Sequence, residues 1–362
     1  MLVVQRSEKK EKSALKISVG LDVHKEKWAV AIYEDGELKK TYSQQSSVEV
    51  LVKHLRRYYE GIEIELAYEA GCCGFWIQRS LQKAGLMCMV VHAADIPSTD
   101  WDRRRKNDKL DARKIGYLLS RGLLKGIYIP SEDQEHLRNI VRGRATVGKL
   151  KRGYMSRIRA HLLRYGISLP QELKGKLWQK RGQAWLSEHS LVDKGLARLQ
   201  KMYNMLRNEE LSVLKMMHQE LEQGSYSALY KYLLSIPGIG RCTAALLISE
   251  LGDINRFKHL DHLASYCGLV PDVRSSAGRE KVLGLSRRGN RRLRTALVES
   301  AWVAKRWDES LANTYSTAIE QGKCPQKAIV KVARRLLNRI RAVWKKGEYY
   351  QKGQEQAIKA RA

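Results

Sequence analysis

Short apolar runs and longer segments of helical period alternate over the first third of the chain. Runs of strand character, rich in β-branched and apolar residues, occupy residues 17–23, 27–35, 37–44, 62–70 and 86–93. Segments with apolar positions at helical spacing occupy residues 46–60, 74–85 and 108–124. Ser46 or Ser47 is placed to cap the first of these helices. The pattern predicts an α/β domain in the order βββαβαβα, which is the order of ribonuclease-H-like nucleases, although a meander followed by βα units also occurs elsewhere.

The strand pattern ends at about residue 130, and helical periodicity takes over. Apolar residues then mark one face of a long helix: Leu196, Leu199, Tyr203, Leu206, Val213, Met217 and Leu221. The pattern predicts a long hairpin of helices, either an amphipathic pair that covers its own core or a dimerising coiled coil, since heptads are not sustained. A helical domain begins near Leu233.

The net charge of the chain indicates the kind of partner that the protein binds. There are 67 Lys and Arg residues against 38 Asp and Glu residues, a formal net charge of +29. Such self-repulsion indicates a polyanionic partner, with nucleic acid as the first candidate. Two tracts, residues 141–166 and 322–347, hold eight and nine basic residues without an acid, so we favour phosphate contact over a merely solvated helix face.

Compartment and redox state follow from what the sequence lacks. No apolar run approaches the ~18 residues of a spanning helix, and the first 16 residues are too charged for a signal peptide, so we expect a cytoplasmic protein without a membrane partner. The six cysteines show no CxxC spacing and no Cys/His cluster, which indicates reduced thiols rather than a zinc site.

Four carboxylates are candidates for a metal site. Asp22 and Glu69 each end an apolar run, and Asp108 and Asp111 lie three apart on a predicted helix, which puts both on one face. Convergent carboxylates in a cleft need cations, and hard oxygen ligands select Mg²⁺ or Mn²⁺. Two such ions could clamp the entering and leaving oxygens of a phosphoryl transfer. The alternative is that the helix pair is simply solvated.

The order of the acids separates classes of nuclease. A proofreading-type exonuclease needs a second acid two residues after the first, where this chain has His24. A transposase of the DDE type has its glutamate last, whereas the last member here is Asp111. The match that remains is to RuvC-like resolvases and their relatives.

A basic, serine-bearing segment follows the helical hairpin. Between Arg274 and Arg294 there are eight basic residues and one acid, and we interpret the segment as a loop that presents a hydroxyl and backbone amides to a phosphate. Ser276 is the candidate nucleophile and Ser275 its rival, although either could be a turn-former. No paired histidine supplies a base, so activation would come from metal and arginine charge.

Several motifs together resemble one family. GLDVHK, YEAG, NDKLDAR, SIPGIG and the stretch from CGLVPDVRSSAG to SRRGNRRLR look like the DEDD transposases of insertion sequences, the bridge-RNA-guided serine recombinases related to the Piv DNA invertase. The resemblance covers roughly residues 17–345. It implies an amino-terminal RuvC-like domain with Asp22, Glu69, Asp108 and Asp111 as metal ligands. Family serines usually precede a glycine directly, whereas Ser276 is followed by Ala277 and then Gly278, which keeps Ser275 as an alternative. The spacing from Pro271 and to Gly289 favours Ser276.

The resemblance also implies a reaction and its partners. The serine attacks DNA and becomes covalently phosphorylated, so that a new 3′ hydroxyl can reclaim the phosphodiester without ATP. Donor and target DNA would be the substrates, and a structured bridge RNA from the element would pair with both of them. The serine of one subunit would meet the carboxylates of another in a homodimer or homotetramer. The sequence thus predicts five segments: a tail (1–16), a RuvC-like metal domain (17–128), a helical hairpin (129–231), a helical transposase domain (232–347) and a second tail (348–362).

Candidate phosphate contacts come from the basic segments and one turn. Pro237, Gly238 and Gly240 in SIPGIG resemble a helix-hairpin-helix element, with a plain helix-helix turn as the alternative. The basic candidates are Arg142, Arg144, Lys149, Lys151, Arg152, Arg274, Arg279, Lys281, Arg287, Arg288, Arg291 and Arg292. Two rival functions stay open: a RuvC-like endonuclease or junction resolvase without a covalent step, and a non-enzymatic nucleic-acid-binding protein.

Overall fold

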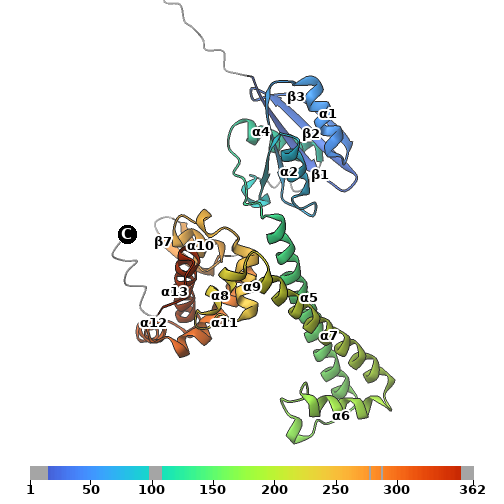
Figure 1. The fold of residues 1–362 in the computed structure, drawn as a ribbon, viewed down its shortest axis with the longest axis vertical. Helices are drawn as coiled ribbons and strands as arrows, with labels where there is room; N and C mark the ends of the chain where they lie inside the picture. Colours follow the sequence, from blue (N-terminus) through green and yellow to red (C-terminus); the bar gives the residue numbers. More distant parts are fainter. Residues whose placement is uncertain (1–14, 98–107, 277–278, 287, 352–362) are drawn as a thin grey trace, which may run out of the picture. The chain divides into compact units, whose positions relative to one another are not determined.

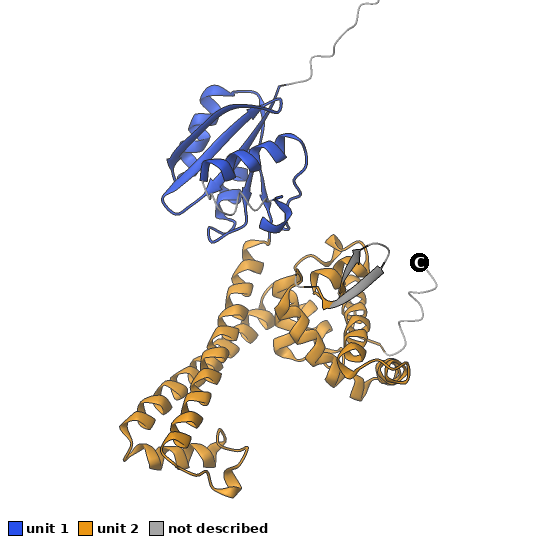
Figure 2. Cartoon of the chain, turned by 180° about the vertical axis from the view of Figure 1, so that it is seen from behind, with its two compact units in different colours: residues 1–129 blue, residues 130–362 orange. Residues whose placement is uncertain are grey.

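The chain divides into two units, residues 1–129 and 130–362 (Figure 2). The computed structural model describes residues 15–97, 108–276, 279–286 and 288–351. Each unit has its own hydrophobic core, and each is described by itself below. The two tails predicted at residues 1–16 and 348–362 lie almost wholly outside the described residues.

A five-stranded mixed sheet forms the centre of the first unit (Figure 1). Its strands are β1 (Lys16–Val23), β2 (Lys27–Glu34), β3 (Glu37–Gln45), β4 (Glu63–Glu69) and β5 (Met87–Val91). They lie in the order β3-β2-β1-β4-β5. The first three strands form the predicted antiparallel meander, while β4 runs parallel to β1 and β5 runs parallel to β4. The carboxyl ends of β1 and β4 therefore meet at the same edge of the sheet.

Helices cover both faces of this sheet. They are α1 (Val48–Tyr58), α2 (Trp76–Lys83) and α4 (Asp108–Ser120), with a short 3₁₀ turn η1 (Ala93–Asp95) after β5. Leu51 of α1 and Leu81 of α2 are fully buried in one core with Val19 of β1. On the other face Ile115 of α4 packs on Ala67 of β4. Strand alternation explains the division, because successive side chains of β1 and β4 point to opposite faces.

Two glycines let α4 approach the sheet closely. A Cβ on Gly20 of β1 would lie 2.1 Å from the backbone oxygen of Ala112 and 2.2 Å from the backbone nitrogen of Gly116. Any side chain at Gly20 would therefore push the helix away. Gly20 and Asp22 are two apart on one strand, so they share the face that α4 covers. This contact brings the start of α4 to the end of β1.

The second unit is mostly helical. It contains α5 (Glu132–Arg164), η2 (Gln171–Leu173), α6 (Lys180–Ser190), α7 (Lys194–Gln223), α8 (Ser227–Leu234), α9 (Arg241–Leu251), η3 (Ile254–Arg256), α10 (Leu260–Tyr266), β6 (Pro271–Ser276), β7 (Arg279–Leu285), α11 (Arg291–Trp307), α12 (Glu309–Glu320) and α13 (Pro325–Lys346). Helices α5 and α7 form the predicted hairpin (Figure 1). Helix α6 packs against the far end of this hairpin, where α5, α6 and α7 share a small hydrophobic core. The larger core lies among α8, α9, α11 and α13.

The basic, serine-bearing segment differs from the sequence prediction. We expected a loop within an all-helical domain, but β6 and β7 pair as an antiparallel hairpin. Val273 and Val282 are partners in this ladder. Valine is typical of strands, and the serines and arginines between the apolar positions hid that pattern.

The coarse fold prediction is confirmed in its other parts. The first unit has the predicted order βββαβαβα, Ser47 caps α1 by accepting from the backbone nitrogen of Val50, and the region after residue 130 is largely helical. In the described part of the chain, no helix has both the length and the apolar character needed to span a membrane. The five-segment division of the chain stays a prediction.

Candidate active site

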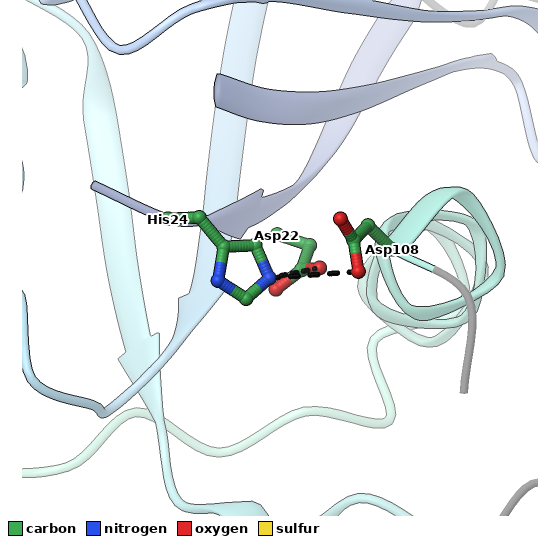
Figure 3. Close-up of side chains that lie close together, drawn as sticks. All are labelled: Asp22, His24 and Asp108. Carbon is green, nitrogen blue, oxygen red and sulfur yellow. Dashed lines mark hydrogen bonds and ion pairs between the residues drawn. The ribbon is translucent and has the colours of Figure 1, made fainter. Parts of the chain in front are cut away.

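Three side chains meet where β1 ends and α4 begins (Figure 3). Asp22 is the penultimate residue of β1, His24 follows that strand, and Asp108 opens α4. The Nε2 atom of His24 lies 3.1 Å from a carboxylate oxygen of Asp22 and 3.6 Å from one of Asp108. One ligand atom from each of the three residues lies within 4.8 Å of the others. This is the only group of its kind among the described residues.

The electrostatics of this group disfavour charge on Asp22. The pKa of Asp22 is raised, first by burial and then by the carboxylates of Asp108 and Asp111, against the opposing effect of His24. The Asp22 side chain is 17% exposed, whereas that of Asp108 is 61% exposed. A partly buried carboxylate beside two others is unfavourable unless a cation balances the charge.

The other two predicted ligands, Asp111 and Glu69, lie outside the cluster of Asp22, His24 and Asp108. Asp111 lies one turn along α4 and is close enough to raise the pKa of Asp22, but it is not among the three clustered residues. Glu69 ends β4 and is exposed, and its neighbour Tyr68 is the register partner of Leu21 in β1. Glu69 and Asp22 therefore occupy the same edge of the sheet. The structure brings Asp22 and Asp108 together directly, and it leaves Glu69 outside their cluster.

The residues present fit a hard divalent cation. Carboxylate oxygens are the ligands that Mg²⁺ and Mn²⁺ prefer, and His24 offers a nitrogen that Mn²⁺ also accepts. The backbone oxygen of His24 accepts a hydrogen bond from Trp28, which helps to fix the turn after β1. Burial and the neighbouring carboxylates raise the pKa of Asp22, and a cation held by Asp22 and Asp108 would oppose both effects by favouring the charged form. The donor set is therefore consistent with the predicted metal site.

Sequence reasoning missed the place of His24 in this group. It used His24 only as a departure from the exonuclease pattern. A signal was available, because residues two apart at a strand end share a face, so the sequence Asp-Val-His places the imidazole beside the carboxylate.

The predicted serine nucleophile and its rival lie in β6. Ser276 is the register partner of Arg279 in β7, and Ser275 is the partner of Glu280. The side chains of residues 273–283, among them Arg274, Arg279 and Lys281, lie outside the described part of the chain, as does all of Arg287. Arg288, Arg291 and Arg292 follow the hairpin and are exposed.

A buried carboxylate organises the base of this hairpin. Glu250 of α9 is 1% exposed and accepts two hydrogen bonds from the guanidinium of Arg142, at 2.8 and 2.9 Å. It also accepts from the side chain of Asn290, which caps α11 directly after the hairpin. Although burial alone would raise it, the pKa of Glu250 is lowered by Arg142, Arg138 and Asn290. Glu250 thus ties α5 and α9 to the start of α11.

Several predicted phosphate contacts have partners inside the protein. Arg142 is held by Glu250, and both Lys151 and Arg144 pair with Glu210 of α7. The three cations therefore have a structural role, whereas the absence of acids from residues 141–166 had indicated phosphate contact. Lys149 and Arg152 are exposed on α5.

The SIPGIG turn joins α8 to α9. Gly238 has a φ of +84°, and a Cβ there would lie 2.5 Å from the backbone oxygen of Ser300 in α11. Close packing therefore explains this glycine. Gly240 is exposed at the N-cap of α9 with open space around it, and Pro237 is half-buried.

Comparison with known proteins gives two family matches. Residues 230–316, which include β6 and β7, match the family described as Transposase IS116/IS110/IS902 family. Residues 19–167, which include all four candidate acids, match the DEDD transposase domain of IS110 elements.

Individual relatives extend this similarity. The y4qE protein of Sinorhizobium fredii is 30% identical over 292 residues, which cover 79% of this chain and 71% of the relative. The transposase for insertion sequence element IS1328 of Yersinia enterocolitica is 30% identical over 56% of this chain and 59% of its own length. The transposase for IS1533 of Leptospira borgpetersenii is 27% identical over 79% of this chain and 85% of its own length.

Proposed function

Because the chain belongs to the IS116/IS110/IS902 family of insertion-sequence transposases, we propose that it cuts and rejoins DNA through a covalent phosphoserine intermediate. The observation that carries the proposal is the approach of Asp22 to Asp108 at the end of β1, within the region that matches a DEDD transposase domain. The order βββαβαβα and the carboxylates at the sheet edge support a ribonuclease-H-like, RuvC-related assignment for the first unit.

In the proposed reaction the hydroxyl of Ser276 attacks a phosphodiester of the DNA. A bond forms between Oγ and phosphorus, the bond from phosphorus to the 3′ oxygen breaks, and the serine proton leaves with the new 3′ hydroxyl. The serine ester keeps the energy of the phosphodiester, so a 3′ hydroxyl of another strand can reverse the step without ATP. Ser275 is the alternative nucleophile.

The carboxylates have a separate task in this proposal. Asp22 and Asp108, with Glu69 and Asp111 nearby, would hold Mg²⁺ or Mn²⁺, which when bound supplies positive charge to the phosphoryl group and the departing oxygen. Asp22 is less exposed than Asp108, and α4 positions Asp108 beside it. His24 orients the Asp22 carboxylate through their 3.1 Å contact.

A trapping experiment tests the covalent step. The full chain is incubated with donor and target DNA in Mg²⁺, quenched in denaturant, and analysed for a protein-DNA adduct. We expect an adduct with the wild-type chain, none with Ser276→Ala, and an adduct with Ser275→Ala as the matched control. Adduct lost only in Ser275→Ala would move the nucleophile by one residue. Cutting without an adduct in any of the three proteins would instead support a hydrolytic resolvase.

RNA guidance is a further part of the proposal. The chain has 67 basic and 38 acidic residues, a net charge of +29. This excess of positive charge is consistent with a protein that binds several nucleic-acid strands. No zinc finger or basic zipper is apparent in the sequence, so sequence choice would come from base pairing with an element-encoded RNA. Sequencing the nucleic acid that copurifies from a native host tests this, and the absence of any transcript from the element would contradict it.

The active form is proposed to be a homodimer or homotetramer. The helical hairpin of α5 and α7 is long enough to serve as an assembly arm. Mass measurement in solution, with and without donor DNA, tests this, and a monomer that still recombines DNA would contradict it.

A further inference from the structure

A groove between α1 and α2 collects positive charge in the first unit. Its volume is about 620 Å³, and its walls include Lys53 and Arg56 of α1 with Lys83 and Ser80 of α2. The three cations are exposed. Arg56 donates one hydrogen bond to the backbone oxygen of Ala84, which holds its guanidinium at the groove.

These three cations lack acidic partners among the residues that the structure describes. The groove has one acid, Glu49, whose carboxylate accepts a hydrogen bond from the hydroxyl of Ser47 instead. Two other lysines of the unit do have acidic partners: Lys16 pairs with Glu65, and Lys39 lies 3.4 Å from Glu37. Cations that gather without acids raise the local potential and attract phosphate groups.

The other flank of α1 presents aromatic rings. The rings of Tyr42, His54 and Tyr58 form a ladder with centroids 4.8 Å apart at each step, and the outermost ring, Tyr58, is 57% exposed. Lys40 and Arg57 lie within 5.6 Å of the Tyr58 ring. Basic side chains around an exposed ring are the combination that binds unpaired bases and their backbone.

This surface is separate from the candidate active site. Helices α1 and α2 pack on one face of the sheet, through Leu51 and Leu81, whereas Asp22 lies on the face that α4 covers. Figure 1 shows α1 beside β3, the edge strand that carries Lys40 and Tyr42. A strand segment held here would therefore lie on the opposite face of the sheet from the candidate active site.

We propose that the solvent face of α1, with Lys83 of α2 and Lys40 of β3, binds a single-stranded segment of nucleic acid. The phosphates lie against Lys53, Arg56 and Lys83, and an unpaired base stacks on Tyr58. RNA and DNA share this chemistry, so the test compares them. Since the proposal concerns binding alone, it is tested without divalent cation, and its failure would leave the serine mechanism untouched.

The first test measures the salt dependence of binding. The full chain and the triple variant Lys53→Ala/Arg56→Ala/Lys83→Ala are titrated with short labelled single strands of RNA and of DNA over a series of salt concentrations in EDTA. We expect the logarithmic salt slope to fall by about 2 in the triple variant, as loss of three phosphate contacts requires. The nucleic acid that shows the larger fall is the native class of ligand.

A matched variant controls for net charge. Lys194→Ala/Arg198→Ala/Lys201→Ala removes the same charge from exposed positions of α7. We expect its salt slope to stay close to that of the wild-type chain. An equal fall in both triple variants, or no fall in either, would overturn the proposal. Unchanged melting temperatures show that the variants fold.

The second test locates the base. Single strands carrying 5-iodouracil are photocrosslinked to the full chain, and the modified peptide is identified by mass spectrometry. We expect a crosslink at Tyr58 that Tyr58→Leu abolishes, and that substitution should weaken single-strand binding about fivefold or more while leaving duplex binding unchanged. Crosslinks that map only outside α1 and β3, or an equal loss of duplex binding, would contradict stacking at Tyr58.

Discussion

Two carboxylates in different units have opposite surroundings. Asp22 in the first unit is partly buried among other acids, and its pKa is raised. Glu250 in the second unit is almost fully buried, yet Arg142, Arg138 and Asn290 lower its pKa despite the burial. The same functional group is thus left short of positive charge in one place and fully compensated in the other.

The difference indicates what each residue is for. A buried acid paired with a bidentate arginine holds secondary-structure elements together. Removing either partner leaves a buried charge uncompensated, which lowers the stability of the fold. An acid crowded by other acids does little for the fold, so we expect Asp22 to act by holding a ligand that brings positive charge. Function and stability are therefore expected to separate when the two sites are mutated.

The largest expected effect concerns Asp22. Asp22→Asn keeps the shape of the side chain but removes its charge, so DNA cutting should fall by about 1000-fold or more, the equivalent of about 4 kcal/mol of transition-state stabilisation. The melting temperature should stay the same or rise, because repulsion from Asp108 and Asp111 is relieved. Cleavage of donor DNA in Mg²⁺ and thermal unfolding measure the two quantities. Glu60→Gln, at an exposed acid in the same unit, should change neither.

The opposite pattern is expected for Glu250. Glu250→Gln leaves Arg142 without its charged partner and should lower the free energy of unfolding of the second unit by about 3 kcal/mol. Denaturant titration measures this loss. Glu209→Gln, an exposed position on α7, is the control and should cost less than about 0.5 kcal/mol. Equal stability of the two variants would show that the Glu250 network contributes nothing to the fold.

A smaller effect tests how α4 is placed at the proposed metal site. Gly20→Ala puts a methyl group against the backbone of Ala112, so α4 must shift at a cost of about 2 kcal/mol. Binding of Mn²⁺, followed by titration calorimetry, should weaken by about tenfold as Asp108 moves away from Asp22. Gly143→Ala in α5, where a Cβ meets nothing within 4 Å, should leave Mn²⁺ binding unchanged. If Gly20→Ala bound Mn²⁺ with wild-type affinity, the contact between Gly20 and α4 would not be needed to position Asp108.

The smallest expected effect is a dependence on pH. Since the native pKa of Glu250 lies below its ordinary value of 4.5, its contribution to stability is present above pH 4.5 and is lost as the pH falls through the lowered native pKa. The wild-type chain should therefore lose more stability on acidification than Glu250→Gln does. Urea titrations at a series of pH values measure this difference. Parallel curves for the two proteins would contradict the pairing.

Much of the first unit was predictable because its elements are encoded locally. The strand residues of β1, β2 and β4 are apolar runs, and Ser47 precedes a helical pattern, so both could be recognised without tertiary information. The hairpin of β6 and β7 was mistaken for a loop because its serines and arginines also suit turns. Its pairing depends on a partner strand rather than on local preference.

The sequence by itself determined the order of the elements, the excess of positive charge and the identity of the candidate acids and serines. Only the tertiary structure decided that His24 lies beside Asp22 and Asp108 and that Glu69 lies outside their cluster. It also decided that Arg142 forms an ion pair with Glu250. The physical reason is distance. Hydrophobic period and capping act between residues a few positions apart, whereas pairing of charges depends on which strand and helix ends meet, as Gly20 and α4 do here.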